Sequence, residues 1–429
     1  MVTLAASVSP TTIDPNPWMI LPFIVMLLSI ALMPFINLHW WEKHYPKVAF
    51  GLALLSVGYY VLVLRHFEPL ADVAHEYISF IALIGSLFIV AGGVHIRVSG
   101  EATPLRNTLY LAIGACIANL IGTTGASMLM IRPWIRMNKY RITAFHIVFF
   151  IFIVGNVGGA LTPIGDPPLF LGYLQGVPFF WTTIHLWMPW MVMVTSLLAI
   201  FHVIDRINFH RAPKAVRDHE TAEESFSMLG KRNFLLLAVI LGAVFLPTPW
   251  REVIMAGAAV ASWYFTPRQV HEMNHFDFHP IKEVAWLFFG IFATMLPALD
   301  YLNVHSDALG VHTPMQYYAL TGILSAVLDN APTYLTFLAT ATAQHGFQLA
   351  KPSEVAAFAA QHADLLTAIS LGAVFFGAAT YIGNGPNFMI KAIAEHAKVE
   401  TPSFFGYVLR YTLPILLPLL ILMALLFLR

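Results

Sequence analysis

The sequence predicts an all-α polytopic membrane protein, built as an inverted repeat of about ten transmembrane helices with two re-entrant hairpins and two broken helices. Composition gives the class: of 429 residues, 58% are hydrophobic and only 11% are charged, against about 25% charged residues in soluble domains. The order of the apolar segments and a short internal repeat give the architecture. The net charge of zero argues against a nucleic-acid partner, and the lone Cys116 excludes an internal disulfide.

Apolar segments long enough to cross a bilayer, which takes about 20 residues, follow one another along most of the chain. Two further segments are shorter, and two are interrupted by Gly and Pro. The predicted crossings are 17–38, 47–66, 77–96, 182–204, 283–302 and 403–428, the shorter 233–249 and 252–266, and the broken 142–175 and 364–394.

Two more apolar segments, 105–131 and 315–343, each have a polar centre, IGTTGAS in the first and LDNAPTY in the second. A straight crossing would bury that centre in the middle of the membrane. A re-entrant hairpin instead puts it at the tip, which is tolerated where protein or water surrounds it. We therefore expect hairpin 105–131 to enter from the cytoplasm and hairpin 315–343 from the periplasm.

The basic residues support this layout. With the N-terminus outside and each hairpin returning to its own side, all 23 Lys and Arg residues lie in cytoplasmic loops except Arg65, Arg251, Lys351, Arg410 and Arg429. This bias follows the positive-inside rule and predicts a multi-pass protein of a bacterial-type inner membrane. The predicted parts are a periplasmic tail (1–16), a first repeat (17–205), a cytoplasmic linker (206–232) and a second repeat (233–429).

Short segments recur in the same order in the two halves. A shift of 207 positions places Glu76 on Glu283 and 122–126 (GTTGA) on 329–333 (DNAPT). A shift of 218 positions then places 162–168 (TPIGDPP) on 380–386 (TYIGNGP). Each half holds five crossings, and because five is odd the halves point in opposite directions through the membrane. Inverted repeats of this kind are typical of secondary transporters.

Polar residues at the hairpin tips and helix breaks are the candidate ion-binding residues. A broken helix frees backbone carbonyls and exposes half-helix ends, and carbonyl, hydroxyl and carboxylate oxygens suit a hard cation. The candidates are Thr123, Thr124, Asn156, Thr162 and Asp166 in the first half and Asp329, Asn330, Thr333, Thr380, Asn384 and Asn387 in the second. Among these, Asp329, Asn330, Thr380, Asp166 and Thr162 are the candidate Na⁺ ligands.

The two carboxylates give the site its chemistry. A carboxylate inside a membrane is costly, and burial disfavours its charged form. Asp166 and Asp329 could therefore hold a proton and release it when a cation arrives. Two structural alternatives remain: either Asp could cap a half-helix, and Thr123 and Thr124 could be packing residues bonded to their own helix.

A different motif, 271–275 (HEMNH), matches the H-E-x-x-H pattern of zinc proteases. His271, Glu272 and His275 would then be catalytic, which makes a membrane metalloprotease the alternative from another class. The pattern needs one helix face for both imidazoles, whereas this segment lies in a polar loop just before Pro280. We therefore expect neither an enzyme nor a bound cofactor.

The strings 155–168 (GNVGGALTPIGDPP) and 328–337 (LDNAPTYLTF) resemble motifs of the ion transporter superfamily. They are most similar to those of the NhaD-type sodium/proton antiporters and their citrate-transporter relatives. The resemblance implies a scaffold whose helices form a homodimer in the lipid bilayer. It also implies a transport domain that carries the site by an elevator-like movement.

The hairpin tips depart from the pattern of the relatives that carry citrate or dicarboxylates, which have Ser-Asn-Thr at both tips. Here the first tip has Thr123 and Thr124 followed by Gly125, and the second has Asp329 followed by Asn330. An Asp at the tip would repel an anionic cargo. We therefore expect a Na⁺(Li⁺)/H⁺ antiporter that loses exchange when Asp329 is replaced by Asn. The alternative is a Na⁺- or H⁺-coupled citrate or dicarboxylate transporter.

Overall fold

A computed structural model describes residues 13–97, 102–211 and 227–428. Most of the predicted tail (1–16) and linker (206–232) lies outside these ranges. The predicted class is confirmed, because nearly all described residues are helical. The strands of the described residues are β1 (His95–Arg97), which follows α2 in the first half, and β2 (Ser227–Leu229), which precedes α8 in the second, and they pair antiparallel.

The two halves contain corresponding elements in the same order. The first half holds η1 (Pro17–Ile20), α1 (Leu21–Gly58), η2 (Tyr59–Leu64), α2 (Glu68–Gly92), α3 (Pro104–Met137), α4 (Ala144–Ile153), η3 (Val157–Leu161), α5 (Pro167–Gln175) and α6 (Trp181–Arg211). The second half holds α8 (Arg232–Ala243), α9 (Trp250–Phe265), α10 (Arg268–Met273), α11 (His279–Val304), η4 (Ser306–Leu309), α12 (Pro314–Val327), α13 (Asn330–Gln344), α14 (Pro352–Gln361), α15 (Ala363–Gly377), α16 (Gly385–His396), α17 (Phe404–Tyr407), η5 (Val408–Leu416) and α18 (Leu417–Phe427).

Within the described ranges, eight helices are long and apolar enough to cross a membrane, or nine if the pair α14 and α15, bent by 100°, counts as one. The eight include α3, which is a hairpin and not a crossing. Helix α1 provides two of them, because its backbone leaves the helical region at Asn37. The prediction of about ten also counted the segments of α8 and α9. These helices have 12 and 16 residues, which is short of the roughly 20 that a crossing needs.

Helix α3 folds back on itself at Gly122. The amide nitrogen of Asn107 donates to the side-chain oxygen of Asn138 at 2.8 Å, and the Tyr110 hydroxyl donates to the Met130 carbonyl at 2.8 Å. In a continuous helix, residues 107 and 138 would lie about 46 Å apart. Gly122 makes the turn with φ 76° and ψ 156°, a conformation that is open to glycine and strained for other residues.

Helices α12 and α13 form the second hairpin. The chain leaves the helical conformation at Leu328 and Asp329 and resumes it at Asn330. At the far end, the Tyr317 hydroxyl donates to the side-chain oxygen of Gln344 at 2.8 Å, so the two helices lie side by side. Both hairpins therefore turn at the polar segments that the sequence analysis placed at their tips.

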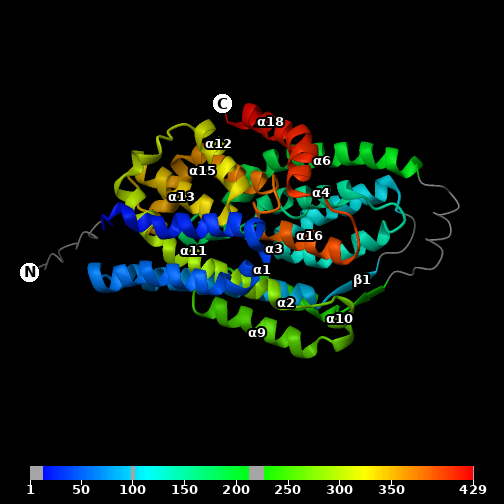
Figure 1. Ribbon diagram of the computed structural model, residues 1–429, viewed down its shortest axis with the longest axis horizontal. Helices are drawn as coiled ribbons and strands as arrows, with labels where there is room; N and C mark the ends of the chain where they lie inside the picture. The colour runs from blue at the N-terminus through cyan, green and yellow to red at the C-terminus, as the bar shows by residue number, and fades with distance from the viewer. Residues whose placement is uncertain (1–12, 98–101, 212–226, 429) are drawn as a thin grey trace, which may run out of the picture.

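The first hairpin, α4 and α16 lie between two outer groups of helices, whereas α12 of the second hairpin lies at the upper edge of the view (Figure 1). Helix α2 contacts α9 and α11, and α11 contacts α1; on the other side, α18 contacts α6. Figure 1 shows α9 and α6 at opposite edges, with α3, α4 and α16 between them. Every side chain from Ile147 to Val154 is 0% exposed. Helix α4 is therefore enclosed by protein and not exposed to lipid along this segment.

A buried polar cluster holds the base of the first hairpin. Asp205 of α6 accepts hydrogen bonds from Arg141, from Nε2 of His146 at 3.1 Å and from the amide of Asn107 at 2.9 Å. All four side chains are buried. Since Asn107 also bonds Asn138, this one carboxylate ties both ends of α3 to α4 and α6. Sequence analysis missed the cluster, because its members lie far apart in the chain.

Replacing Asp205 with Ala should destabilise the fold by about 3–5 kcal/mol, because the substitution leaves the Arg141 guanidinium buried without its counter-ion. Thermal unfolding in detergent measures the effect. The control is Lys351→Ala, which breaks an ion pair with Glu354 between partly exposed side chains and should leave the melting temperature unchanged. Equal melting temperatures for both variants would contradict this role of the cluster.

Candidate functional site

Equivalent threonines anchor the two helix breaks to the two hairpins. The Thr162 hydroxyl donates to the Asn119 carbonyl at 2.6 Å and accepts from the N–H of the glycine three residues further on at 3.1 Å. Thr380 repeats both bonds, to the Ala326 carbonyl at 2.6 Å and from the corresponding glycine at 3.2 Å. The shared Thr-x-Ile-Gly pattern therefore fixes the breaks against the hairpins. The hydroxyls of both candidate residues are occupied by these bonds.

The glycines of the repeated motif let the backbone of each break fold tightly. A Cβ atom added at Gly165 would collide with the Gly159 carbonyl, and one added at Gly159 would collide with that of Gly165. Gly377 and Gly383 face each other in the same way in the second half. Only glycine fits such an approach of two backbones.

Asp166 occupies the N-cap position of α5, but its side chain does not cap the helix. Pro167 and Pro168 follow it and have no N–H to offer. The N–H groups of Leu169 and Phe170 bond the main-chain carbonyl of Asp166 instead. The carboxylate is therefore free to point away from α5, and it is buried with 1% of the residue exposed.

The Asp166 carboxylate accepts hydrogen bonds from three different elements. Oδ1 accepts from the Thr123 hydroxyl at 2.8 Å, at the first hairpin tip, and from the Asn384 amide at 2.9 Å, in the second break. Oδ2 accepts from the Asn330 amide at 2.7 Å, at the second hairpin tip. Both tips and both breaks thus meet at one carboxylate, which is the geometry of a shared site between the repeats.

Asn156 and Asn387 extend this cluster. Asn156 accepts from the Asn384 amide at 3.1 Å and donates to Asn387 at 2.7 Å. Both side chains are 0% exposed. Six of the predicted residues are therefore joined in one hydrogen-bonded cluster, namely Thr123, Asn156, Asp166, Asn330, Asn384 and Asn387.

Asp329 and Thr333 complete the second tip without bonding Asp166. Oδ1 of Asp329 accepts from the Ala331 N–H at 3.0 Å and so caps α13, and the Thr333 hydroxyl donates to the Asp329 carbonyl at 2.9 Å. Of the two carboxylates considered as helix caps, Asp329 therefore is one and Asp166 is not. Thr124 has a different position, in the lining of a cavity beside Asp166.

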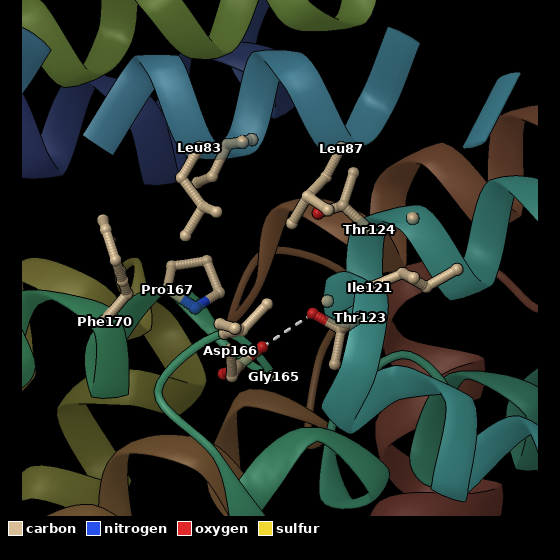
Figure 2. A pocket seen from close by; sticks show the side chains of 13 residues that line it. Leu83, Leu87, Ile121, Thr123, Thr124, Gly165, Asp166, Pro167 and Phe170 are labelled. Carbon is tan, nitrogen blue, oxygen red and sulfur yellow. Dashed lines mark hydrogen bonds between the residues drawn. The ribbon is translucent and has the colours of Figure 1, made fainter. Parts of the chain in front are cut away.

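That cavity lies between α2, the first hairpin tip and the first break (Figure 2). Leu83 and Leu87 of α2 face it from one side, with Thr123, Asp166 and Phe170 opposite and beside them. Its volume of about 20 Å³ is enough for one water molecule or small ion. Sequence analysis could not single out Leu83 and Leu87, because apolar residues at helical spacing are typical of any membrane helix.

The HEMNH segment does not form a zinc site. Helix α10 ends at Met273, and His275 lies beyond it with φ 44°, so the imidazoles of His271 and His275 do not share a helix face. His271 packs against the ring of Trp263. Among the described residues, no group of three or more His, Cys, Asp or Glu side chains could hold a metal ion.

Comparison with known proteins identifies the family. The chain matches the model of the family described as "Putative citrate transport" over residues 14–428. The chain belongs to this family. A "46 kDa membrane protein" of Mycobacterium leprae (strain TN) is 26% identical over 317 residues, which cover 69% of this chain and 71% of that protein. The family and the apolar helices together identify a multi-pass membrane protein of a transporter family; the NhaD-type assignment stays a prediction.

Gly383→Ala should impair folding and transport, because the new methyl group meets the Gly377 and Ser325 carbonyls at 2.7 Å. Gly385→Ala, two residues further on, is the matched control, since nothing lies within 4 Å of its Cβ position. Size-exclusion chromatography of the detergent-solubilised variants gives the folded yield. Equal loss in both variants, or in neither, would contradict the close packing of this break.

Proposed function

We propose that the protein is a secondary active transporter that exchanges Na⁺ or Li⁺ for H⁺, with Asp166 as the carboxylate that binds either. The main support is the charge of the site. Asp166 is buried and its three hydrogen-bond donors are neutral side chains. In the part of the chain that the structure describes, neither Asp166 nor Asp329 forms an ion pair. An unpaired buried charge is costly, so a proton or a cation is favoured there.

Asn330 supplies a second oxygen for the cation. Its side chain is 0% exposed, and its Oδ1 has no hydrogen-bond partner among the described residues. A buried amide oxygen without a partner is unfavourable, and a hard cation would satisfy it. The proposed ligands are therefore Oδ2 of Asp166 and Oδ1 of Asn330, and the Na⁺ or Li⁺ that they bind is the cargo.

The meeting of both hairpin tips at Asp166 suits alternating access. One tip belongs to each repeat, and the repeats point in opposite directions in the predicted topology. Moving the hairpins and breaks together, in an elevator-like movement of a homodimer, would carry the site from one side of the membrane to the other. Binding either H⁺ or Na⁺, and never both, would make that movement an exchange.

The second candidate is Na⁺- or H⁺-coupled transport of citrate or a dicarboxylate, which the description of the family favours. The residues around the cavity favour a cation instead. Leu83, Leu87 and Phe170 are apolar, Asp166 is acidic, and none of the lining residues is basic. A tricarboxylate in this place would have to bring cations with it.

Everted membrane vesicles that contain the protein test the exchange directly. After acidification of the lumen, addition of Na⁺ or Li⁺ should dequench a pH-sensitive dye, because protons leave as cations enter. Asp166→Asn should abolish the signal, since the amide cannot take up a proton or balance a cation. Absence of dequenching by wild-type protein between about pH 6.5 and 9, the range over which carboxylate and cation can compete, would refute the proposal.

Asp329→Asn should keep a measurable part of the exchange. Asn caps a helix as well as Asp does, so the substitution removes the charge and leaves the tip of α13 intact. The same vesicle assay, at matched protein levels, gives the rate. Complete loss of exchange at normal yield would show that the charge of Asp329 takes part in coupling, as the sequence analysis expected.

Labelled citrate separates the two candidates. Proteoliposomes with a Na⁺ or H⁺ gradient should accumulate no citrate above protein-free liposomes if the cargo is a cation alone. Uptake that depends on the gradient and is lost in Asp166→Asn would establish the second candidate in place of the first.

A further inference from the structure

We propose that Asn156 and Asn387 do not bind cargo but fix the orientation of the Asn384 amide, so that Asn384 always directs its nitrogen to Asp166. We call these three residues the asparagine relay. The inference rests on the proposed function in one respect: the cargo of Asp166 is a cation. It assigns Asn156 and Asn387 as positioning residues and leaves one oxygen of Asp166 for the cation.

The relay begins at two main-chain carbonyls. The amide nitrogen of Asn387 donates to the Gly377 carbonyl at 2.7 Å and to the Thr380 carbonyl at 2.8 Å. A carbonyl oxygen can only accept, so the Asn387 nitrogen must face the break. Its oxygen is thereby turned to the other side, where it accepts from the Asn156 amide at 2.7 Å.

Asn156 passes this orientation to Asn384. Its nitrogen also donates to the Ile151 carbonyl at 2.8 Å, which again can only accept. The Asn156 oxygen therefore faces Asn384 and accepts from its amide at 3.1 Å. The amide nitrogen of Asn384 then donates to Oδ1 of Asp166 at 2.9 Å.

A flipped Asn384 would be unfavourable. Its oxygen would face the Asn156 oxygen and the Asp166 carboxylate, and no proton would lie between these acceptors. Asn156 and Asn387 are 0% exposed and Asn384 is 1% exposed, so water does not compensate. The main-chain carbonyls that hold Asn156 and Asn387, together with the Gly155 carbonyl that accepts directly from Asn384 at 3.3 Å, thus favour the orientation in which the Asn384 nitrogen meets the carboxylate.

The two oxygens of Asp166 are therefore not equivalent. Oδ1 has two donors, Thr123 and the fixed Asn384 amide. Oδ2 has one donor, Asn330, whose own oxygen is without a partner among the described residues. A cation meets fewer competing hydrogens at Oδ2. The relay thus directs the cargo to the side of the second hairpin tip and weakens its binding, because a donor on Oδ1 stabilises the empty carboxylate.

Two variants test the relay, Asn156→Leu and Asn387→Leu. Each leaves Asn384 held by the Gly155 carbonyl and Asp166 without the relay, so the hydrogen bond to the empty carboxylate weakens and cations bind more tightly. In the vesicle assay the apparent KM for Na⁺ should fall about tenfold, the effect of one such bond. In an Asn384→Leu background neither variant should lower the KM further, since the link to Asp166 is already cut.

Asn119→Leu is the matched control. Asn119 of α3 is also a buried amide that bonds a helix break, since it donates to the Gly158 carbonyl at 2.6 Å and accepts from the Leu161 N–H at 2.8 Å. Among the described residues its side chain has no bond to the Asp166 cluster. Its loss should lower the folded yield and leave the KM for Na⁺ unchanged. An unchanged KM in both relay variants, or an equal fall in Asn119→Leu, would overturn the proposal.

An infrared measurement separates failure of the relay from failure of the proposed function. With ¹³C-labelled aspartate, the difference between wild type and Asp166→Asn isolates the carboxylate stretch of Asp166. That band should shift in both relay variants and in Asn384→Leu, and stay in place in Asn119→Leu. The shift is expected whatever the cargo, so it tests the relay even if the vesicles show no exchange. An unshifted band in both relay variants would overturn the proposal.

Discussion

The hydrogen bonds to Asp166 are the interaction on which the rest of the site depends. A carboxylate removed from water must find donors or a counter-ion within the protein. Its donors, Thr123, Asn330 and Asn384, come from three segments that are far apart in the chain. The hairpin tips must turn, and the helices must break, where they do in order to bring these donors together. The two anchoring threonines and the paired glycines serve that placement and never touch the carboxylate.

The two repeats share the contacts that hold the backbone of each break, but they differ in the polar residues at the centre. Thr162 and Thr380 make equivalent bonds, and the same pairs of glycines meet in both breaks. The polar residues at the centre differ, since Asp166 corresponds to Asn384 under the 218-position shift. A duplicated backbone scaffold therefore holds a single carboxylate with an amide opposite it. The buried cluster around Asp205 is a second asymmetry, because it secures the base of one hairpin alone.

Much of this architecture could be predicted because it depends on local sequence. Polar segments flanked by apolar ones placed the turns near Gly122 and Asp329, and the Thr-x-Ile-Gly motif placed both breaks. Contacts between distant segments could not be predicted, since one sequence carries no record of which side chains meet. For this reason Asp205 was missed, and the sequence did not show that Asp166, unlike Asp329, accepts side-chain hydrogen bonds from both halves of the chain. The pattern of Asp followed by Asn at a hairpin tip predicts equally well a helix cap and an ion ligand, and only the structure, through the bond from the Ala331 N–H, shows that Asp329 caps α13.

The short distance between positions 166 and 384 explains why one holds an acid and the other an amide. The Asn384 nitrogen lies 2.9 Å from the Asp166 oxygen, so carboxylates at both positions would be in contact, and their repulsion would disfavour two negative charges in one buried site. An amide at the second position supplies a donor instead, provided that its nitrogen faces the acid. An amide has nearly the same shape when flipped, so packing alone cannot hold that orientation. Bonds to main-chain carbonyls can, because a carbonyl cannot become a donor. A single carboxylate in this duplicated fold thus requires neighbouring hydrogen bonds that keep the nitrogen of the Asn384 amide, and not its oxygen, towards Asp166.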